Sequence, residues 1–382
     1  MRLKATASAL FLAVAVLAVG ISGCGGGDGS TSTGGTASGE STNDSAGLQA
    51  AAAAIKPYVG QARPAFPVSE PLSEPPKAGS ELSQLQFGTP TAALIAEITE
   101  GAVAAAGLPI GTVKAGNTAT SVQAAADTII SQSPDAVLLP AAEPTTFSQQ
   151  LGEMDEKGIK SYSAGIMNPQ DFGITAGIFD QRQSKLVGKL LADWVTVKGE
   201  GSTKVVFYET PELSFNAIER DAFLGEMKAV CSGCEARTVA ISAEELGSTA
   251  PQTVVSDLQR HSDTEAAVFA TQEAASGLPS ALKIAGIDVE VVGFAAGPTE
   301  LEYIKNGEMD ATLGLDLPVM VWTQVDMALR GIAGQQLTPG EKAGIMPMQF
   351  LTQEDITFDP SKGWTATPNF AEKFASLWKV SP

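Results

Sequence analysis

Basic residues are scarce in this sequence: 24 Lys and Arg stand against 43 Asp and Glu in 382 residues, a formal charge of −19 at neutral pH. A surface with that balance repels phosphate groups, so we expect no nucleic-acid partner. Histidine occurs once, as His261, so a Ser-His-Asp or Cys-His active site would depend on that residue alone. The chain also lacks a Gly-rich phosphate loop, a Gly-x-Ser-x-Gly elbow and clustered metal ligands. We therefore predict no enzyme, no catalytic residue, no cofactor and no metal site.

Cysteine is rare as well, and two of the three cysteines, Cys231 and Cys234, form a Cys-x-x-Cys pair between a predicted helix and a predicted strand. This spacing is compatible with a redox pair, half of a zinc site or a local disulfide. Zinc requires four ligands, and the sequence contains no second pair of this kind. In an exported chain, where thiols oxidise, a structural disulfide is favoured.

The third cysteine follows a short apolar run near the N-terminus. Arg2 and Lys4 precede apolar or small residues from Ala5 to Ile21, which is typical of an export signal. The run ends in Ile-Ser-Gly-Cys24, which resembles the lipobox of bacterial lipoproteins, in which cleavage precedes a lipid-carrying cysteine. Residues 1–23 are thus predicted to be a lipoprotein signal peptide and Cys24 the lipid anchor, at the outer face of the bacterial cytoplasmic membrane. An ordinary secretory signal with an incidental cysteine is the alternative.

The next residues are poor in large apolar side chains. Residues 24–47 consist almost entirely of small and polar residues, which predicts a disordered Gly/Ser/Thr tether. Residues 48–79 are predicted to be a short Ala-rich helix, up to Tyr58, and then a Pro-rich extended segment that runs over a surface.

From Ser80 onward, short apolar segments alternate with amphipathic ones. A strand at Asp135–Leu139 precedes a helix at Thr145–Lys157, and a strand at Lys204–Tyr208 precedes a helix at Asn216–Val230. This alternation predicts an α/β fold with parallel sheets covered on both faces. The number of units exceeds one doubly wound sheet, so we predict two. Ligands bind at the carboxyl ends of such strands.

Several of these segments resemble the type I periplasmic binding proteins, the group that includes the ribose-binding protein. The resemblance implies two doubly wound lobes joined by a hinge of three crossovers, near residues 178–180, 315–318 and 345–349. Lobe one is expected at 80–180 and 316–346, and lobe two at 181–315 and 347–382. The segments that carry the resemblance are, in chain order, Asp135–Glu143, Asp180 with Gly188, Ile218–Leu224, Ala267–Ala270, Val291–Phe294 and Leu301–Gly307.

The same resemblance implies ligand-binding residues at the strand ends. Glu143 and Asp180 have an alternative role as helix caps, and Arg220 as a surface ion-pair partner. The expected ligand-binding residues are Asn117, Glu143, Asp180, Phe215, Arg220, Gln272, Glu273 and Asp316.

Four positions depart from the family pattern. Thr89–Ala93 replaces an aromatic pair, Ser163–Gly165 ends a strand without a carboxylate, Thr271–Glu273 replaces Asn-Asp, and Gly293–Ala295 replaces Gly-Phe-Asp. Each lost carboxylate removes a charge-assisted acceptor worth roughly 1.5–3 kcal/mol. We therefore expect a ligand with few hydroxyls or with an apolar face, which Phe87, Phe215 or Phe294 would contact.

Together these features predict a solute-binding lipoprotein, monomeric, that delivers a sugar-like or less polar small molecule to the permease of an ABC importer. A receptor of the same fold that reports its ligand to a membrane signalling partner is the alternative. An enzyme on this scaffold is disfavoured by the missing catalytic motifs.

Overall fold

A computed structural model of the chain describes residues 40–380. The predicted signal peptide, Cys24 and residues 24–39 of the predicted tether lie outside these residues. Helix α1 (Glu40–Ile55) begins inside the segment expected to be tether, because its contacts with lobe two stabilise more of it than its composition suggests. Gly47 lies so close to α6 that an added Cβ would stand 2.1 Å from the Val230 carbonyl oxygen. Within residues 40–380, no helix is long and apolar enough to span a membrane.

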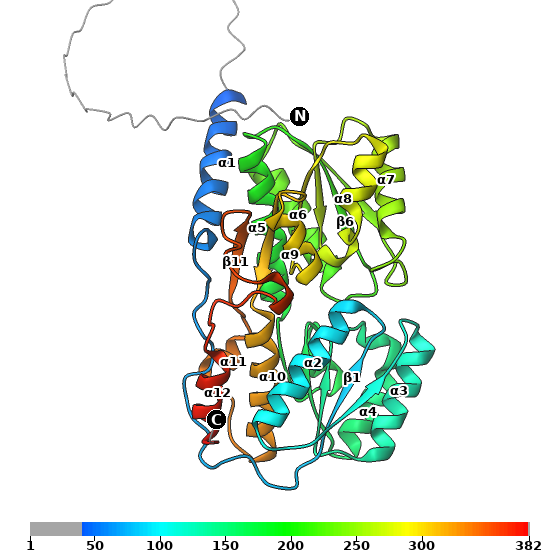
Figure 1. The fold of residues 1–382 in the computed structure, drawn as a ribbon, viewed down its shortest axis with the longest axis vertical. Coiled ribbons are helices and arrows are strands. Elements are labelled where there is room, and N and C mark those ends of the chain that lie inside the picture. Colours follow the sequence, from blue (N-terminus) through cyan, green and yellow to red (C-terminus); the bar gives the residue numbers. More distant parts are fainter. Residues whose placement is uncertain (1–39, 381–382) are drawn as a thin grey trace, which may run out of the picture. The chain divides into compact units, whose positions relative to one another are not determined.

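Lobe one is built on a five-stranded parallel sheet in the order β2-β1-β3-β4-β5 (Figure 1). Neighbouring residues of β3 point to opposite faces, so Leu138 joins the core under α2 and α10, while Val137 joins the core under α3 and α4. The elements of lobe one are β1 (Leu82–Gln86), α2 (Pro90–Ala105), β2 (Ile110–Lys114), α3 (Ala119–Gln132), β3 (Ala136–Leu139), α4 (Ser148–Glu156), β4 (Lys160–Ala164), β5 (Ala176–Ile178) and α10 (Leu317–Ile332).

Lobe two is built on a six-stranded sheet in the order β11-β10-β9-β8-β6-β7, parallel except for β11, which is antiparallel to β10. Helices α5 and α6 cover one face, with α1 outside them, and α7, α8 and α9 cover the other. Its elements are α5 (Gln181–Lys198), β6 (Lys204–Glu209), α6 (Asn216–Val230), β7 (Glu235–Ala240), α7 (Ala250–Arg260), β8 (Ala266–Phe269), α8 (Leu278–Ala285), β9 (Glu290–Phe294), α9 (Pro298–Lys305), β10 (Ala311–Leu315) and β11 (Met348–Thr352).

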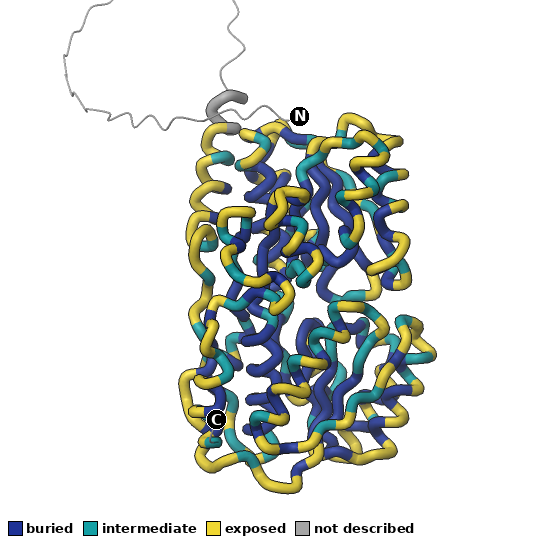
Figure 2. The backbone as a smooth tube through the Cα atoms, viewed as in Figure 1, coloured by how far each residue is buried: buried dark blue, intermediate teal, exposed yellow. Residues whose placement is uncertain are grey.

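Buried strands form the centre of each lobe, and the outer faces of the helices are exposed (Figure 2). All residues of β3, β8 and β10 are buried, as expected for strands covered on both faces. Short 3-10 turns complete the description: η1 (Lys56–Tyr58), η2 (Pro144–Phe147), η3 (Pro169–Phe172), η4 (Gln272–Ala275) and η5 (Pro360–Lys362).

Three crossovers join the lobes. The chain passes from β5 to α5 after Ile178, from β10 to α10 after Leu315, and from the short helix α11 (Pro339–Ala343) to β11 before Met348. The predicted fold class, two α/β lobes with mostly parallel sheets and a three-crossover hinge, is therefore confirmed.

The C-terminal helix differs from the expectation. Residues 347–382 were all expected in lobe two, but α12 (Phe370–Trp378) packs on α10 and α2 of lobe one. The reason is aromatic: the rings of Trp322 and Trp378 stack with centroids 5.2 Å apart, and Phe374 packs against both. Trp378 Nε1 also donates to Asp326 at 2.6 Å. The buried aromatic stack and the hydrogen-bonded indole N–H therefore hold α12 on lobe one.

The Pro-rich segment, residues 59–79, connects α1 on lobe two with β1 of lobe one, and we name it the strap. It first pairs with β11, where the Arg63 amide donates to the Met348 carbonyl at 2.9 Å. It then reaches lobe one, where the Leu72 amide donates to the Leu377 carbonyl of α12 at 2.8 Å. Leu72 is buried. The strap therefore contacts both lobes on the side of the crossovers (Figure 1).

Candidate ligand-binding cavity

A cavity of about 520 Å³ lies where the carboxyl ends of the two sheets face each other. Its walls come from the loops after β1, β2, β3, β4 and β5 of lobe one, and after β6, β7, β8, β9 and β10 of lobe two. Parallel strands place these loops at one edge of each sheet, which is why residues far apart in sequence converge here. The volume suits a small organic molecule.

Most of the cavity wall is apolar. Within this wall, Phe179 packs against both Phe215 and Phe294, with ring centroids 5.4 Å from each. Phe179 belongs to the first crossover and adopts a φ of 56°, in the left-handed region that bulky residues rarely occupy. Its amide donates to the Gly344 carbonyl of the third crossover at 2.8 Å, which helps to hold this conformation. A ring between the lobes is thus fixed at the hinge.

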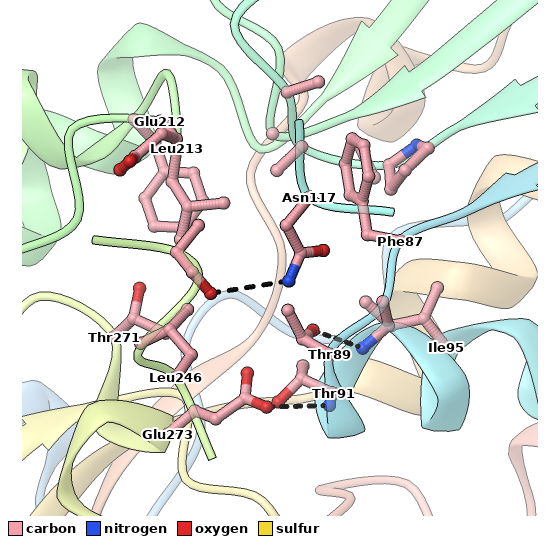
Figure 3. Close-up of a pocket in the computed structure, with 18 of the residues that line it drawn as sticks. Phe87, Thr89, Thr91, Ile95, Asn117, Glu212, Leu213, Leu246, Thr271 and Glu273 are labelled. Atoms are coloured by element: carbon pink, nitrogen blue, oxygen red, sulfur yellow. Dashed lines mark hydrogen bonds between the residues drawn. The ribbon is translucent and has the colours of Figure 1, made fainter. Parts of the chain in front are cut away.

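The lobes touch directly across the cavity (Figure 3). The amide of Thr91, in the first turn of α2, donates to Glu273 Oε1 at 3.2 Å. Asn117 Nδ2 donates to the Ala243 carbonyl at 3.4 Å, while Asn117 Oδ1 accepts from the Gly88 amide at 2.9 Å. These contacts join lobe one to lobe two, so the structure represents a closed arrangement.

The polar groups of the wall are mainly threonine hydroxyls and carboxylates. Thr89 and Thr118 cap two of the helices that begin at the cavity, α2 and α3, by accepting from the amides of Ala92 and Ser121. The wall contains three carboxylates and, among the described residues that line it, no lysine, arginine or histidine; the carboxylates are those of Glu143, Glu212 and Glu273.

Glu273 is the most enclosed of these carboxylates, with 4% of its surface exposed. Burial raises its pKa above the ordinary value, and the charge of Glu300 acts in the same direction, while the hydrogen bonds from Thr91 oppose the shift. Glu143 is half-buried and accepts from the amide and the hydroxyl of Thr145, at 3.3 and 2.8 Å. It therefore caps η2, the alternative role considered from the sequence, while also lining the cavity.

Of the eight expected ligand-binding residues, the structure brings four to the cavity: Asn117, Glu143, Phe215 and Glu273. Two of the others cap helices at crossovers. Asp180 accepts from the Arg182 amide at 2.8 Å and pairs with its guanidinium. Asp316 accepts from the amides of Val319 and Ala366, and burial raises its pKa to about 6. Neither side chain lines the cavity.

Arg220 and Gln272 are also held within lobe two. Arg220 Nη1 binds both oxygens of Glu209, at 2.9 and 3.0 Å, and Arg220 Nε binds Asp221 at 2.9 Å. Gln272 is fully buried and donates to the Ala311 carbonyl at 3.1 Å. The expectation that Arg220 faces the cleft is wrong, because two acidic neighbours take its donors.

Sequence reasoning missed several wall residues, chiefly Phe179, Leu213 and Leu246. Phe179 directly precedes Asp180. The sequence therefore indicated this part of the chain, but assigned the ligand contact to the neighbouring side chain. Leu213 and Leu246 lie in loops without a family motif. Their apolar character in otherwise polar loops is the only signal that the sequence offers.

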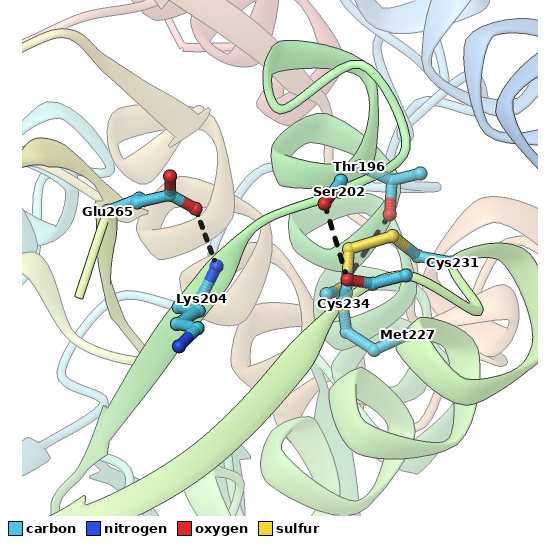
Figure 4. The surroundings of a disulfide bond; sticks show 8 residues. Thr196, Ser202, Lys204, Met227, Cys231, Cys234 and Glu265 are labelled. Atoms are coloured by element: carbon cyan, nitrogen blue, oxygen red, sulfur yellow. Dashed lines mark hydrogen bonds between the residues drawn. A yellow bond between two sulfur atoms is a disulfide. The ribbon is translucent and has the colours of Figure 1, made fainter. Parts of the chain in front are cut away.

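Cys231 and Cys234 are joined by a disulfide between α6 and β7, with their Cα atoms 5.4 Å apart (Figure 4). Neither lines the cavity. Over residues 40–380, no group of three or more His, Cys, Asp or Glu is arranged to hold a metal ion.

Two α/β lobes closed over a ligand-sized cavity define the hinged class of solute-binding proteins. The chain belongs to the family described as periplasmic binding protein domain, whose family model matches residues 92–336. The resemblance inferred from the sequence is thereby confirmed. This family consists of extracytoplasmic binding proteins rather than enzymes. Among curated protein sequences, none matches the chain.

Solved structures share the fold at low identity. The 5-methylthioribose transporter solute-binding protein of Thermotoga lettingae is 15% identical, with a TM-score of 0.66 over 81% of this chain and 99% of that one. An ABC sugar transporter subunit of Rhodobacter sphaeroides is 16% identical, with a TM-score of 0.64 over 72% and 99%. A putative LacI transcriptional regulator of Bacteroides fragilis is 12% identical, with a TM-score of 0.64 over 72% and 98%. At these identities the likeness concerns the fold alone.

Proposed function

We propose that this chain is an exported solute-binding lipoprotein that captures a small ligand between its lobes and delivers it to the permease of an ABC importer. The observation that carries the proposal is the cavity whose walls come from both lobes, beside a hinge of three crossovers. A ligand that contacts both lobes binds the closed form better than the open one, and only such a difference shifts the population toward closure.

The wall composition favours a ligand less polar than a free monosaccharide. Phe87, Phe179, Phe215 and Phe294 offer apolar faces, and the strand ends at Ser163–Gly165 and Gly293–Ala295 offer no carboxylate. Sugar hydroxyls that face these rings would lack partners, and each unsatisfied buried polar group is costly. A similar structure from Thermotoga lettingae was determined with 5-methylthioribose, a sugar derivative with an apolar substituent. The mixed polar and apolar wall supports, for the present chain, a ligand with both a polar and an apolar part.

The sequence supports attachment to a membrane. After cleavage before Cys24, a diacylglyceryl group would be the anchor, and residues 24–39 would link it to α1. A receptor that reports its ligand to a membrane signalling partner is the alternative, because closure on a ligand serves both roles. The presence of permease and ATPase genes beside this gene would favour the importer.

The proposal is tested by a thermal-shift screen of sugars, polyols, purines and small aromatic compounds, followed by hydrogen exchange with each hit. We expect a hit to raise the melting temperature and to protect residues 87–91 of lobe one and 271–273 of lobe two together. Protection of one lobe only would contradict capture by closure. For the anchor, we expect Cys24→Ser to move the protein from the membrane fraction to the soluble fraction, while Cys231→Ser leaves it membrane-bound.

A further inference from the structure

The charged side chains among the described residues that line the cavity are all acidic. The wall contains the carboxylates of Glu143, Glu212 and Glu273, and no cationic side chain among the described residues that line it. The whole chain adds to this field with its formal charge of −19. A cleft lined by charge of one sign concentrates ligands of the opposite sign and excludes those of the same sign.

Glu273 is the most buried of the three carboxylates in the cavity wall. Its carboxylate is nearly fully buried, it lines the cavity, and it forms no ion pair with any residue between 40 and 380. A second buried carboxylate, Glu300, lies close enough for its charge to raise the pKa of Glu273. Buried charges in proteins are ordinarily paired, because desolvation without a partner is costly.

Helix N-termini at the cavity offset only part of this charge. Helices α2, α3, α6 and α10 begin there, and each contributes about half a positive elementary charge. Thr89 and Thr118 already accept from amides in the first turns, and Glu273 accepts from the Thr91 amide. Four helix ends thus balance about two of three carboxylates, so an anionic ligand would still meet an excess of negative charge.

Aromatic rings around the cavity suit a cation as well as an apolar body. Phe87, Phe179, Phe215 and Phe294 all line it, and the face of an aromatic ring attracts a cation within about 6 Å of its centroid. The same rings remove apolar surface of a ligand from water. Glu273 and these rings therefore favour one kind of molecule, with an apolar body and a positive charge.

We propose that the ligand of this cavity is an organic cation, a small apolar or aromatic molecule with an ammonium group that pairs with Glu273. This inference rests on the proposed function, because it assigns the chemical class of the solute that the lobes capture. A ligand ammonium would give Glu273 the ion pair that the chain itself does not provide, and would lie between the lobes near the Thr91 contact.

The test uses three probes of nearly the same shape: phenethylamine, which is cationic, phenethyl alcohol, which is neutral, and phenylacetate, which is anionic. Binding to the purified mature protein is measured by isothermal titration at pH 7. We expect phenethylamine to bind at least about tenfold more tightly than the alcohol, since a charge-assisted hydrogen bond exceeds a neutral one. We expect phenylacetate to bind most weakly.

Glu273→Gln removes the charge and keeps an oxygen that can accept from the Thr91 amide, so the lobe contact can persist. We expect this variant to lose most of the preference for phenethylamine and to bind the alcohol as before. Glu302→Gln, an exposed change on α9 outside the cavity, is the matched control and should alter neither affinity. Circular dichroism checks that each variant is folded.

The inference and the proposed function fail in different ways. Equal or tighter binding of the alcohol or of phenylacetate, an unchanged preference in Glu273→Gln, or no binding of the amine overturns the cation assignment. If a neutral sugar then binds and protects both lobes from hydrogen exchange, the proposed function stands without it. If no compound of any charge protects both lobes, the proposed function fails too.

Discussion

The two lobes meet on two sides of the molecule, and the contacts differ in kind. On the cavity side, the direct hydrogen bonds are few: 3.2 Å between the Thr91 amide and Glu273, 3.4 Å between Asn117 and the Ala243 carbonyl, and 2.7 Å between the Ser214 hydroxyl and the Gly165 carbonyl. On the hinge side, the lobes share three covalent crossovers, the strap and the segment between β11 and α12. Opening of the cavity therefore requires the loss of a few hydrogen bonds, whereas the hinge side can keep its covalent connections.

The hinge side is stabilised by a buried group of charges. Arg330 of α10 donates from Nε to Asp326 at 2.6 Å and lies 3.3 Å from Glu341 of α11. It also donates to the Glu70 carbonyl of the strap, and Asp326 accepts from Trp378 of α12. One guanidinium thus joins the strap, α10 and α11, and through Asp326 also α12. The strap, α11 and α12 lie outside residues 92–336, which match the family model, whereas α10 lies within them.

The largest effect is expected from Arg330→Met. This change leaves Asp326 and Glu341 buried without their cation, and breaking a buried pair in this way costs about 3–5 kcal/mol. The measurement is the free energy of unfolding in a denaturant titration. Lys189→Met is the control, because it removes an exposed ion pair with Glu226 and should cost about 1 kcal/mol or less. Equal costs for the two variants would show that the hinge side does not depend on the buried group.

An intermediate effect, dependent on pH, is expected at Asp193 of α5, the helix that follows the first crossover. Asp193 is 2% exposed, and burial together with the charge of Glu226 raises its pKa to about 7. In the unfolded chain the pKa is about 3.9, so the folded state binds this proton more tightly. The resulting stability is complete below about pH 4 and is lost as the pH rises through about 7.

Asp193→Asn keeps the shape of the side chain and removes the titration. We expect the variant to melt a few degrees above the wild type at pH 8 and close to it at pH 5, as measured by calorimetry. A gain of the same size at both pH values would assign the effect to packing rather than to the buried charge.

The sequence predicted the lobes and crossovers because these depend on local patterns. Apolar strands, helix caps such as Thr89 and glycines after helices are readable within a few residues of each other. The return of α12 and the path of the strap are not, since they depend on contacts such as that between Ser73 and Gln335, which are 262 residues apart. No local pattern specifies such a pairing.

Half of the expected ligand-binding residues line the cavity, because strand ends can be recognised in the sequence and side-chain partners cannot. Asn117 and Glu273 follow strands and reach the cavity. Arg220 stands on a matching helix, but Glu209, eleven residues earlier at the end of β6, takes its guanidinium. A family position therefore indicates where a residue lies, while the residues around it decide what it binds.

The smallest effect is expected on the cavity side, from Asn117→Ala. The change removes the bond to the Ala243 carbonyl, which at 3.4 Å is a weak contact between the lobes, and the bond from the Gly88 amide within lobe one. We expect the closed form to lose about 1 kcal/mol or less relative to the open form, roughly a fivefold change in their ratio. Small-angle X-ray scattering of the ligand-free protein should show a larger mean radius of gyration than for the wild type. Asn306→Ala, at the end of α9 and outside the cavity, should leave the radius unchanged. An unchanged radius in Asn117→Ala would mean that the Asn117 contact does not contribute to the angle between the lobes.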